Sequence, residues 1–525
     1  MHKFTEKLKE NLRGHKKSAE SVDDPMFSAM DPPQSVLYQY RKQRGVNLGS
    51  WFVLERWITD NPYRFANAPG QSDLDVARGS HARETLESHW DSWIVEEDWS
   101  WIAERGFNTV RIPIGYYHLC GTDPSVLHGT AFHDFEYVFS GAWARITRAI
   151  ETASRYGLGV LIDLHAAPGK QNNDSHSGTS DPPTFFSDKR NRKHTIEVLC
   201  ILLKALNAHA QSYNPALTNL VGIELLNEPH PSNDSDLQCW YTSAIRALRA
   251  IDPSMPLYIG ECWRTDQYTN FAEKLSSSSS SSSSLLVLDH HLYRCFTASD
   301  NSTPAHAHTR ALSDPSASTP QTLSRVSEKL GRAGGGLVVG EWSGALNPGS
   351  LMGAPGEQAA YVRAQLELYE RCCAGWFFWT FKKQWPGDTG WSLRDSVGAG
   401  VFPDRVGLRR RGVGVDKAVE QERRARVRDE VRDWALDAHK RYWAQYPGKY
   451  EHWRFGEGFV RGWEVEYVFI DSGSGDDPHG RVTELGFKGA WARQTTQDHG
   501  KGYWEYEHGF MQGVDAATRD FQYSS

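Results

Sequence analysis

Residues 220–230, LVGIELLNEPH, combine the two features that decide the fold: an apolar run and, directly after it, a cluster of polar residues. A continuously apolar run is typical of a parallel strand that is buried on both of its faces. Seven more β-rich runs occur along the chain, each bounded by Gly, Asn or charged residues. They span residues 43–49, 108–114, 159–165, 256–261, 285–293, 336–342 and 375–381.

Segments with helical periodicity lie between or after these runs. They span residues 140–155, 193–207, 238–250, 357–371 and 415–440. Eight βα repeats predict an α/β protein that is a closed (β/α)8 TIM barrel rather than an open doubly wound sheet. No Gly-rich phosphate-binding motif follows the first run, which argues against a nucleotide site.

The repeats also predict the domain organisation. We expect the barrel to occupy residues 37–445, after a polar and disordered segment at 1–36 and before an aromatic C-terminal extension at 446–525 that packs on the barrel. Two low-complexity stretches interrupt the barrel. The nine-serine tract Ser276–Ser284 is expected to be a flexible spacer, and residues 297–322 a flexible loop that is either a mobile rim or simply disordered.

The extension contains an internal near-repeat. WRFGEGFVRGW (453–463) and WEYEHGFMQGV (504–514) share the pattern Trp-x-aromatic-x-x-Gly-Phe-x-x-Gly-apolar. Two copies are too few for a solenoid. We interpret them as two short aromatic elements that pack on the barrel or on each other, and the sequence leaves open whether they also meet a protein partner.

The composition of the 525-residue chain excludes several classes of function. A formal net charge of −7 gives no overall attraction to phosphate backbones, so we expect no nucleic-acid partner. No run approaches the roughly 20 apolar residues that a membrane span requires. Seven cysteines, few and odd in number, predict reduced thiols. Residues 1–21 lack the apolar core of a secretory signal, so the sequence predicts a cytoplasmic protein.

Polar and aromatic residues cluster at the carboxyl ends of the predicted strands. In a (β/α)8 barrel these ends form one face, where different strands bring their side chains together in the active site. Any one of these residues alone is more often a turn or capping residue, but the same placement on so many strands favours a site. They are Asn47, Arg111, His165, Asn227, Glu228, His291, Tyr293, Glu341 and Trp379.

Glu228 in LLNEPH and Glu341 in VVGEWS lie on the fourth and seventh runs. Two carboxylates across a barrel mouth suit hydrolysis of a glycosidic bond, because one donates a proton to the leaving oxygen while the other attacks the anomeric carbon. The retaining mechanism needs the carboxyls about 5 Å apart, and the inverting mechanism needs a larger separation. Like charge and partial burial are expected to raise the pKa of the acid partner.

At this point the sequence resembles glycoside hydrolase family 5, and within it the fungal exo-β-1,3-glucanase and β-glucosidase group. The resemblance implies a retaining double-displacement mechanism on a (β/α)8 barrel, with neither a metal nor an organic cofactor. The matching segments are RGVNLGSWFVLERWI (44–58), GFNTVRIPIGYY (106–117), VLIDLHAAPGKQNNDSHSG (160–178), GIELLNEPH (222–230), LDHHLY (288–293), VVGEWS (338–343) and GWFFWTFKK (375–383).

The resemblance also implies roles for single residues. Glu228 resembles the family's general acid/base and Glu341 its nucleophile. Arg111 is similar to the arginine that orients the nucleophile and keeps it ionised through charge-assisted hydrogen bonds. Asn227 resembles the residue that holds the 2-hydroxyl of the sugar, a contact that strengthens in the transition state.

Five further residues are carried over as substrate-binding groups. His165, His291 and Tyr293 resemble the polar ring around the sugar in the −1 subsite, with Tyr293 near the nucleophile. Trp379 resembles the aromatic platform beneath that sugar, whose C–H face packs on a flat ring. Glu55 matches a glutamate that can bind outer hydroxyls.

Four residues depart from the pattern of the secreted glucanases in this group. Ser50 stands in place of a Gly and Arg56 in place of a Pro, while Lys383 and Trp385 replace acidic or amide residues after the eighth strand. The −1 subsite therefore resembles the family, and the aglycone side differs from it. An intracellular β-glucoside, a short oligosaccharide, a glycolipid or a steryl glucoside is an alternative substrate to cell-wall glucan.

A carbohydrate-binding barrel without enzymatic activity is the alternative from another functional class. Retention of both glutamates argues against it, because binding alone does not require an acid and a nucleophile. We therefore expect a carbohydrate or β-glucoside as the partner of this chain, and hydrolysis as its reaction.

Overall fold

Eight parallel strands close into a barrel in sequence order, β1 to β8, each paired with the next and β8 with β1. This confirms the predicted (β/α)8 barrel and all eight β-rich runs. The strands are β1 (Gln43–Asn47), β2 (Thr109–Gly115), β3 (Gly159–Ala166), β4 (Leu220–Glu224), β5 (Leu257–Gly260), β6 (Leu286–Leu292), β7 (Gly336–Trp342) and β8 (Gly375–Phe378). The computed structural model describes residues 31–278, 285–410, 416–473, 477, 479–496 and 500–524.

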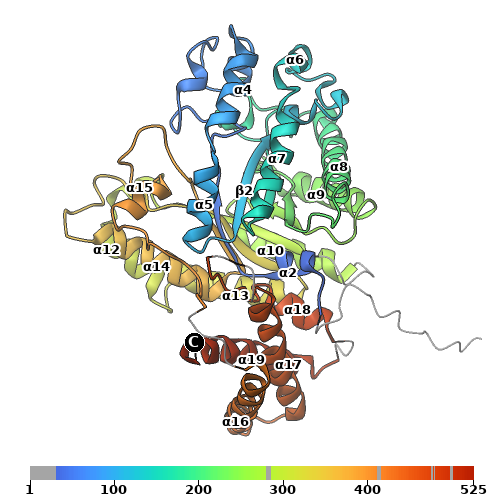
Figure 1. Ribbon diagram of the computed structural model, residues 1–525, viewed down its shortest axis with the longest axis vertical. Helices are drawn as coiled ribbons and strands as arrows, with labels where there is room; N and C mark the ends of the chain where they lie inside the picture. Colours follow the sequence, from blue (N-terminus) through green and yellow to red (C-terminus); the bar gives the residue numbers. More distant parts are fainter. Residues whose placement is uncertain are drawn as a thin grey trace, which may run out of the picture.

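Helices surround the barrel in the order that the periodicity predicts (Figure 1). The five predicted helical segments correspond to α7, α8, α9, α14 and α16. The helices up to the eighth strand are α2 (Gln34–Tyr40), α3 (Asp73–Ala77), α4 (Ala82–Ser92), α5 (Glu96–Glu104), α6 (Glu136–Phe139), α7 (Ala142–Arg155), α8 (Lys189–Gln211), α9 (Asp234–Arg249), α10 (Thr265–Ser278), α11 (Ala298–Ser302), α12 (Ala305–Ser313), α13 (Ser318–Arg332) and α14 (Glu357–Cys372). Short 3-10 turns lie at Asn61–Tyr63, Tyr116–Leu119, Pro124–Leu127, His133–Phe135 and Ser175–Ser177.

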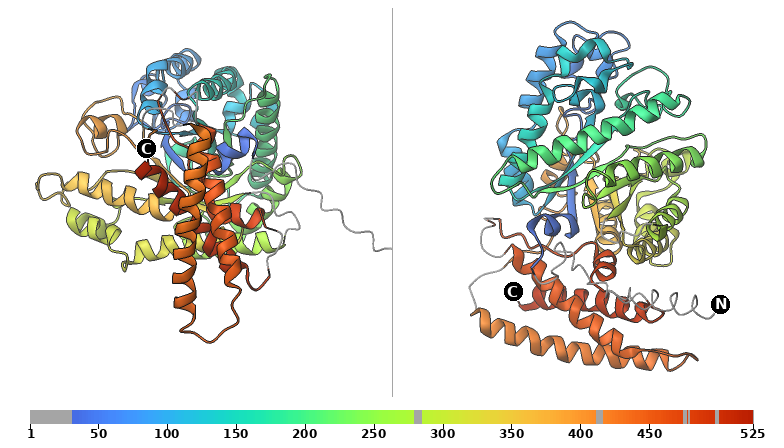
Figure 2. Two further views of the ribbon diagram at one scale, coloured as in Figure 1. Left: turned by 60° about the horizontal axis from the view of Figure 1, so that its bottom comes forward. Right: turned by 90° about the vertical axis from the view of Figure 1, so that its right-hand side faces the viewer.

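The last helices of the chain cover the N-terminal face of the barrel. They are α16 (Lys417–Trp443), α17 (His452–Ser472), α18 (Lys488–Gln494) and α19 (Tyr503–Ser524), and Figure 2 shows α16, α17 and α19 as a layer at the end of the barrel. Helix α15 (Leu393–Gly398) lies apart from this layer (Figure 1). One buried cluster joins the two parts. It includes Leu161, Val221, Tyr258, Val287, Val338 and Phe377 of the strands and Val465, Phe469, Trp491, Phe510 and Val514 of the C-terminal helices.

The two near-repeats lie on α17 and α19 and pack against each other through their glycines. A Cβ on Gly458 would lie 2.1 Å from the carbonyl oxygen of Tyr506, and a Cβ on Gly509 would lie 2.0 Å from that of Phe455. The second pair of glycines, one turn further along each helix, meets the partner helix in the same way. Because only Gly allows so close an approach, the repeated spacing marks a helix–helix contact with approximate two-fold symmetry.

Residues 297–322 differ from the expectation of a flexible loop, since they form α11, α12 and the start of α13. Thr297 and Asp300 close a capping box on α11, and Pro320 occupies the first turn of α13, where its missing N–H costs no hydrogen bond. Leu312 and Leu323 are fully buried. The polar composition therefore concealed two amphipathic helix faces.

Other expectations about domain organisation stay predictions. Residues 1–30 of the N-terminal segment lie outside the described residues, and α2 begins at Gln34. Helix α10 continues to Ser278, and the remainder of the serine tract is also outside the described part. Helix α16 precedes the predicted boundary at residue 445, yet it packs on α17 and α19.

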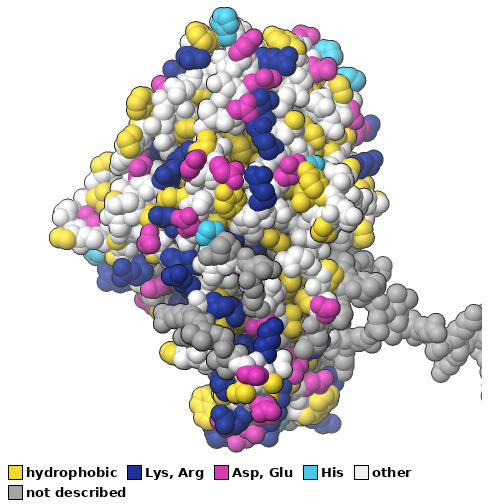
Figure 3. All heavy atoms as spheres, in the orientation of Figure 1, with side chains coloured by type: hydrophobic (Ala, Val, Ile, Leu, Met, Phe, Trp, Pro, Cys, Tyr) yellow, Lys and Arg dark blue, Asp and Glu magenta, His cyan; other side chains and the backbone are white. Residues whose placement is uncertain are grey.

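No described helix combines the length and the apolar character that are needed to cross a bilayer. On the face shown in Figure 3, Lys and Arg side chains are interspersed with Asp and Glu.

Candidate active site

Arg111 on β2 is completely buried and organises the acidic side chains at the strand ends. Its guanidinium donates to groups from β1, β4, β7 and the segment after β4, and it also pairs with β3. The acceptors and distances are Glu224 Oε2 (2.7 Å), Asn227 Oδ1 (2.8 Å), Glu341 Oε1 (2.9 Å), Asn47 Oδ1 (3.0 Å) and Asp163 Oδ2 (3.1 Å). One rigid cation thus fixes the relative positions of five strand-end side chains.

Glu341 lies at the end of β7 with both carboxylate oxygens engaged. Arg111 donates to Oε1, and the Tyr293 hydroxyl donates to Oε2 at 2.9 Å. The side chain is 6% exposed. These two donors hold the carboxylate in one orientation, as a nucleophile requires.

Glu228 follows β4 in a left-handed backbone conformation, with φ of 42°. His291 contacts it at 2.7 Å between Nδ1 and Oε1, and the same nitrogen lies 3.5 Å from Glu341 Oε2. One oxygen of Glu228 and one of Glu341 lie within 4.8 Å of each other. This proximity suits the retaining geometry, in which the carboxyls are about 5 to 5.5 Å apart.

Glu228, His291 and Glu341 titrate together, because all three are buried and in contact. Burial works against the positive charge of His291, but Glu341, Asp289 and Glu228 outweigh it and hold its pKa well above the usual range. Burial would also raise the pKa of Glu228, yet the hydrogen bond and charge of His291 prevail and lower it to about 2. The expected upward shift instead falls on Glu341, whose pKa burial raises to about 8 against the attraction of His291 and Arg111.

Other residues predicted for the −1 subsite lie next to this centre. Asn227 donates its amide toward His165 Nε2 at 3.4 Å, and the other ring nitrogen of His165 contacts Asp163 at 2.6 Å. The His165 ring stacks parallel to Trp379, with 5.7 Å between ring centroids. The structure therefore brings Asn227, His165 and Trp379 together around the carboxylates.

Glu55 lies on the same side, at the edge of an aromatic rim. Its Oε2 accepts a hydrogen bond of 2.8 Å from the Trp57 indole, and burial raises its pKa to about 8, with the charges of Glu341 and Glu228 adding to the shift. The rim is formed by side chains in mutual ring contact or exposed beside them. They are Trp57, Tyr293, Phe296 and Trp391, with Lys383 4.7 Å above the Trp57 ring and Trp385 exposed.

His176, which is not among the predicted site residues, also lies close to Glu228. Its Nε2 lies 4.0 Å from Glu228 Oε2, and its Nδ1 is buried without a hydrogen-bond partner among the described residues. A histidine in the loop after β3, within a matched motif, was the only signal. Three further carboxylates of the barrel are paired: Glu224 and Asp163 with Arg111, and Glu261 with His290 at 2.6 Å.

By spacing alone, Glu228, His291 and Glu341 could also hold a metal ion. Their facing atoms are already joined by hydrogen bonds to one another, to Arg111 and to Tyr293, so acid–base chemistry between the two carboxyls accounts for the arrangement without one.

The chain matches two family models. Residues 78–384 match the model described as Cellulase (glycosyl hydrolase family 5). Residues 424–521 match the model described as Glucan 1,3-beta-glucosidase 3 C-terminal domain. The first covers most of the barrel, and the second covers the helices from α16 to α19.

Curated relatives extend the match over nearly the whole chain. Glucan 1,3-beta-glucosidase 3 of Schizosaccharomyces pombe is 31% identical over 90% of this chain and 94% of its own length. Probable glucan 1,3-beta-glucosidase A of Aspergillus clavatus is 28% identical over 70% of this chain and 89% of its own. Among solved structures, a rutinosidase from Aspergillus niger shares the fold, with a TM-score of 0.53 at 18% identity over 69% of this chain and 98% of its own.

The family model spans more than half of the chain, and the fission-yeast relative aligns with nearly all of it. The resemblance that the strand-end motifs suggested is therefore confirmed: the chain belongs to glycoside hydrolase family 5 and is a glycosidase built on a (β/α)8 barrel.

Proposed function

We propose that this enzyme is a retaining exo-β-1,3-glucosidase that removes terminal β-glucosyl units, with Glu228 as the acid/base and Glu341 as the nucleophile. The observation that carries the proposal is the pair of carboxyls less than 5 Å apart at their nearest oxygens, one held by Arg111 and Tyr293 and the other by His291. Relatives named glucan 1,3-beta-glucosidase support the linkage.

Glu228, His291 and Glu341 share their protons, and the reactive form has Glu341 ionised and a proton on Glu228. In the first step a Glu341 oxygen attacks the anomeric carbon while the bond to the aglycone oxygen breaks. The leaving oxygen takes the proton of Glu228, and the product is a glycosyl ester on Glu341. His291 holds a proton next to Glu228 in the free enzyme and can return it to that carboxyl. Arg111 and Tyr293 keep the attacking oxygen aligned.

In the second step Glu228, now a carboxylate, takes a proton from water. The water oxygen attacks the anomeric carbon, the ester bond to Glu341 breaks, and the sugar leaves with its original configuration. Asn227 is proposed to bind the 2-hydroxyl, Trp379 the C–H face, and His165 and Glu55 the outer hydroxyls of the −1 sugar. The position of these four side chains near the two carboxyls supports these roles.

The rim favours a second candidate substrate, a β-glucoside whose aglycone is flat and apolar, such as an aryl or steryl glucoside. Trp57, Phe296 and Trp385 are 44%, 70% and 68% exposed. Exposed aromatic rings offer contact area to an apolar aglycone as well as to a sugar. The two candidate substrates place the same glucosyl unit in the −1 subsite and differ only in the aglycone that leaves.

The experiment is a rate comparison with purified protein on laminarin oligosaccharides, aryl β-glucosides and steryl β-glucosides, each beside Glu341→Gln. Release of glucose from the non-reducing end of laminarin oligosaccharides at the highest kcat/KM supports the exo-glucanase. A preference of about 10-fold or more for the apolar glucosides supports the second candidate. The absence of hydrolysis of all three substrate classes would overturn both candidate functions.

We also propose a division of the chain into a polar N-terminal segment at residues 1–36, a catalytic barrel at 37–445 and a C-terminal extension at 446–525. Helix α16 belongs functionally to the extension, because it packs on α17 and α19. A reducing, cytoplasmic location is part of the proposal. All seven cysteines are free, in support of it. Fractionation of cells that express the tagged full-length chain tests the location.

A further inference from the structure

Three side chains from three C-terminal helices meet far along the chain from the catalytic residues. They are His439 near the end of α16, His452 at the start of α17 and Glu505 in the first turn of α19. We propose that this three-helix cluster is a binding site for a divalent transition-metal ion, with Zn²⁺ the ion that its donor set fits best.

The donor atoms converge on one point. Glu505 Oε2 lies 3.1 Å from His439 Nε2 and 2.9 Å from His452 Nδ1, and all three atoms lie within 4.8 Å of one another. Metal bonds of about 2.0 to 2.1 Å separate two ligands of a tetrahedral zinc ion by roughly 3.3 Å. Glu505 Oε2 already lies near this separation from both imidazole nitrogens, so a small rotation of the two rings would place all three donors around one ion.

Burial separates this cluster from an ordinary surface hydrogen bond. His439 and Glu505 are each 1% exposed. Among the described residues, the two histidines are the only ion-pair partners of Glu505, and no Lys or Arg forms an ion pair with it. A buried carboxylate without a fixed cation is costly, and a bound metal ion supplies the missing positive charge.

The surroundings of the cluster are those of a positioned site. The backbone N–H of Glu451 donates to the other oxygen of Glu505 at 2.6 Å, which fixes the carboxylate. Phe455 stacks on the His439 ring at 4.3 Å, and Tyr450 stacks on the His452 ring at 5.3 Å. His452 is 25% exposed, so an ion can enter from solvent on its side.

The donor chemistry points to zinc. Two imidazoles and one carboxylate are ligands that zinc prefers, whereas Mg²⁺ and Ca²⁺ prefer oxygen alone. Three protein ligands leave the fourth tetrahedral position for water. Because the ligands come from three helices, the ion would tie α16 to the α17–α19 pair and stabilise the extension without touching the catalytic centre.

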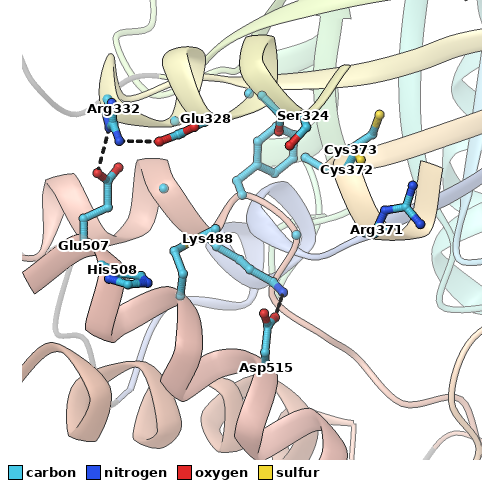
Figure 4. Close-up of a pocket in the computed structure, with 18 of the residues that line it drawn as sticks. Ser324, Glu328, Arg332, Arg371, Cys372, Cys373, Lys488, Glu507, His508 and Asp515 are labelled. Carbon is cyan, nitrogen blue, oxygen red and sulfur yellow. Dashed lines mark hydrogen bonds and ion pairs between the residues drawn. The ribbon is translucent and has the colours of Figure 1, made fainter. Parts of the chain in front are cut away.

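The neighbouring pocket offers no comparable donor set. It has a volume of about 510 Å³ and lies between the barrel and the C-terminal helices (Figure 4). Two ion pairs line it: Arg332 of α13 contacts Glu507 of α19 at 3.1 Å, and Lys488 of α18 contacts Asp515 of α19 at 2.5 Å. The first of these pairs links the barrel to the C-terminal helices.

The test is titration of Zn²⁺ into full-length protein, stripped with a chelator, by calorimetry and by measured metal content. Wild type is expected to bind one equivalent with micromolar or tighter affinity and to gain thermal stability. Glu505→Gln, which keeps an acceptor for the Glu451 N–H, and His452→Gln should each weaken binding at least about 10-fold and lose the stability gain. His306→Gln, at an exposed histidine of α12, is the matched control and should bind like wild type.

Two outcomes overturn the proposal. One is the absence of Zn²⁺ binding by wild type at micromolar concentration. The other is binding that survives Glu505→Gln and His452→Gln but is lost in His291→Ala, which would assign the ion to the catalytic centre. If Glu505→Gln does not fold, His452→Gln decides alone, because its side chain is partly exposed. Glucosidase activity of His452→Gln should equal that of wild type whichever substrate proves correct.

Discussion

The two ends of the barrel each bury an arginine among carboxylates, and they use it differently. At the N-terminal end Arg44 makes a two-point contact with Glu370 at 2.7 and 2.9 Å and binds Glu484 of the extension at 2.6 Å. At the C-terminal end Arg111 holds Glu341 opposite a second carboxyl, Glu228. The first arrangement joins barrel to extension; the second leaves two carboxyls facing each other. Burial of charge alone does not identify a site, whereas two carboxyls that face each other and share contacts with one histidine, His291, do.

Glu341→Gln is the substitution with the largest expected effect, and it tests the assignment of the C-terminal end of the barrel as the active site. It removes the proposed nucleophile but keeps the shape of the side chain, so kcat/KM on the best β-glucoside should fall by about 10⁴-fold or more. Glu261→Gln is the matched control, since Glu261 is a buried strand-end carboxylate paired with His290 outside the proposed site. It should change kcat/KM by less than about 10-fold. Equal losses in both variants would contradict the assignment.

Gly462→Val tests the N-terminal end of the barrel, where α17 and α19 pack closely against each other. The new Cβ would lie 2.1 Å from the carbonyl oxygen of Phe510, so α17 and α19 must separate. We expect the free energy of unfolding to fall by about 3 kcal/mol, measured by denaturant titration. The kcat of the folded fraction should not change, because the helices do not reach the strand ends that carry the carboxyls. A large loss of kcat at unchanged stability would show that the two ends are coupled.

Glu466 provides a pH test of the same region. It is completely buried, and burial, with Glu484 adding to it, raises its pKa to about 8. Between its ordinary pKa of 4.5 and about 8 the folded state keeps a proton that the unfolded state has lost, so stability falls as pH rises. We expect a loss of about 2 kcal/mol between pH 5 and pH 7 from this group. Denaturation of Glu466→Gln should lack this part of the slope; an identical slope would exclude Glu466 as its source.

His176→Asn should have the smallest effect. Burial lowers the pKa of His176, so it is neutral at pH 7, and kcat/KM there should change less than about 3-fold. In acid the imidazole gains a proton 4.0 Å from Glu228 and favours the ionised form of that carboxyl. The variant should therefore retain more activity than wild type on the acid side of the pH–rate profile. Superimposable profiles would remove His176 from the site.

Much of the barrel could be predicted from the sequence, because parallel strands buried on both faces leave continuous apolar runs. The carboxylates at the strand ends were predictable for the same reason, because Glu228 follows and Glu341 nearly ends such a run, whereas Arg111 lies within β2. Residues 297–322 were not predictable, because their helices depend on capping and on the burial of Leu312 and Leu323 against the barrel. The composition of this segment indicates only that it is polar, whereas its helices are determined by tertiary packing.

The near-repeats show a similar limit. The spacing of Gly458 and Gly462, repeated at Gly509 and Gly513, was visible, but the length of α17 and α19 and their close approach were not. His176 was missed because its role depends on the fold of a loop. Its distance to Glu228 cannot be derived from the 52 positions that separate the two in the chain.

The stereochemistry of the first-formed product tests the central claim most directly. Hydrolysis of an aryl β-glucoside, or of a laminarin oligosaccharide, can be followed by proton NMR before the released glucose mutarotates. Two carboxyls with oxygens within 4.8 Å of each other predict the β-anomer as the first product. The α-anomer as first product would mean that water attacks directly, and would contradict the double displacement through Glu341.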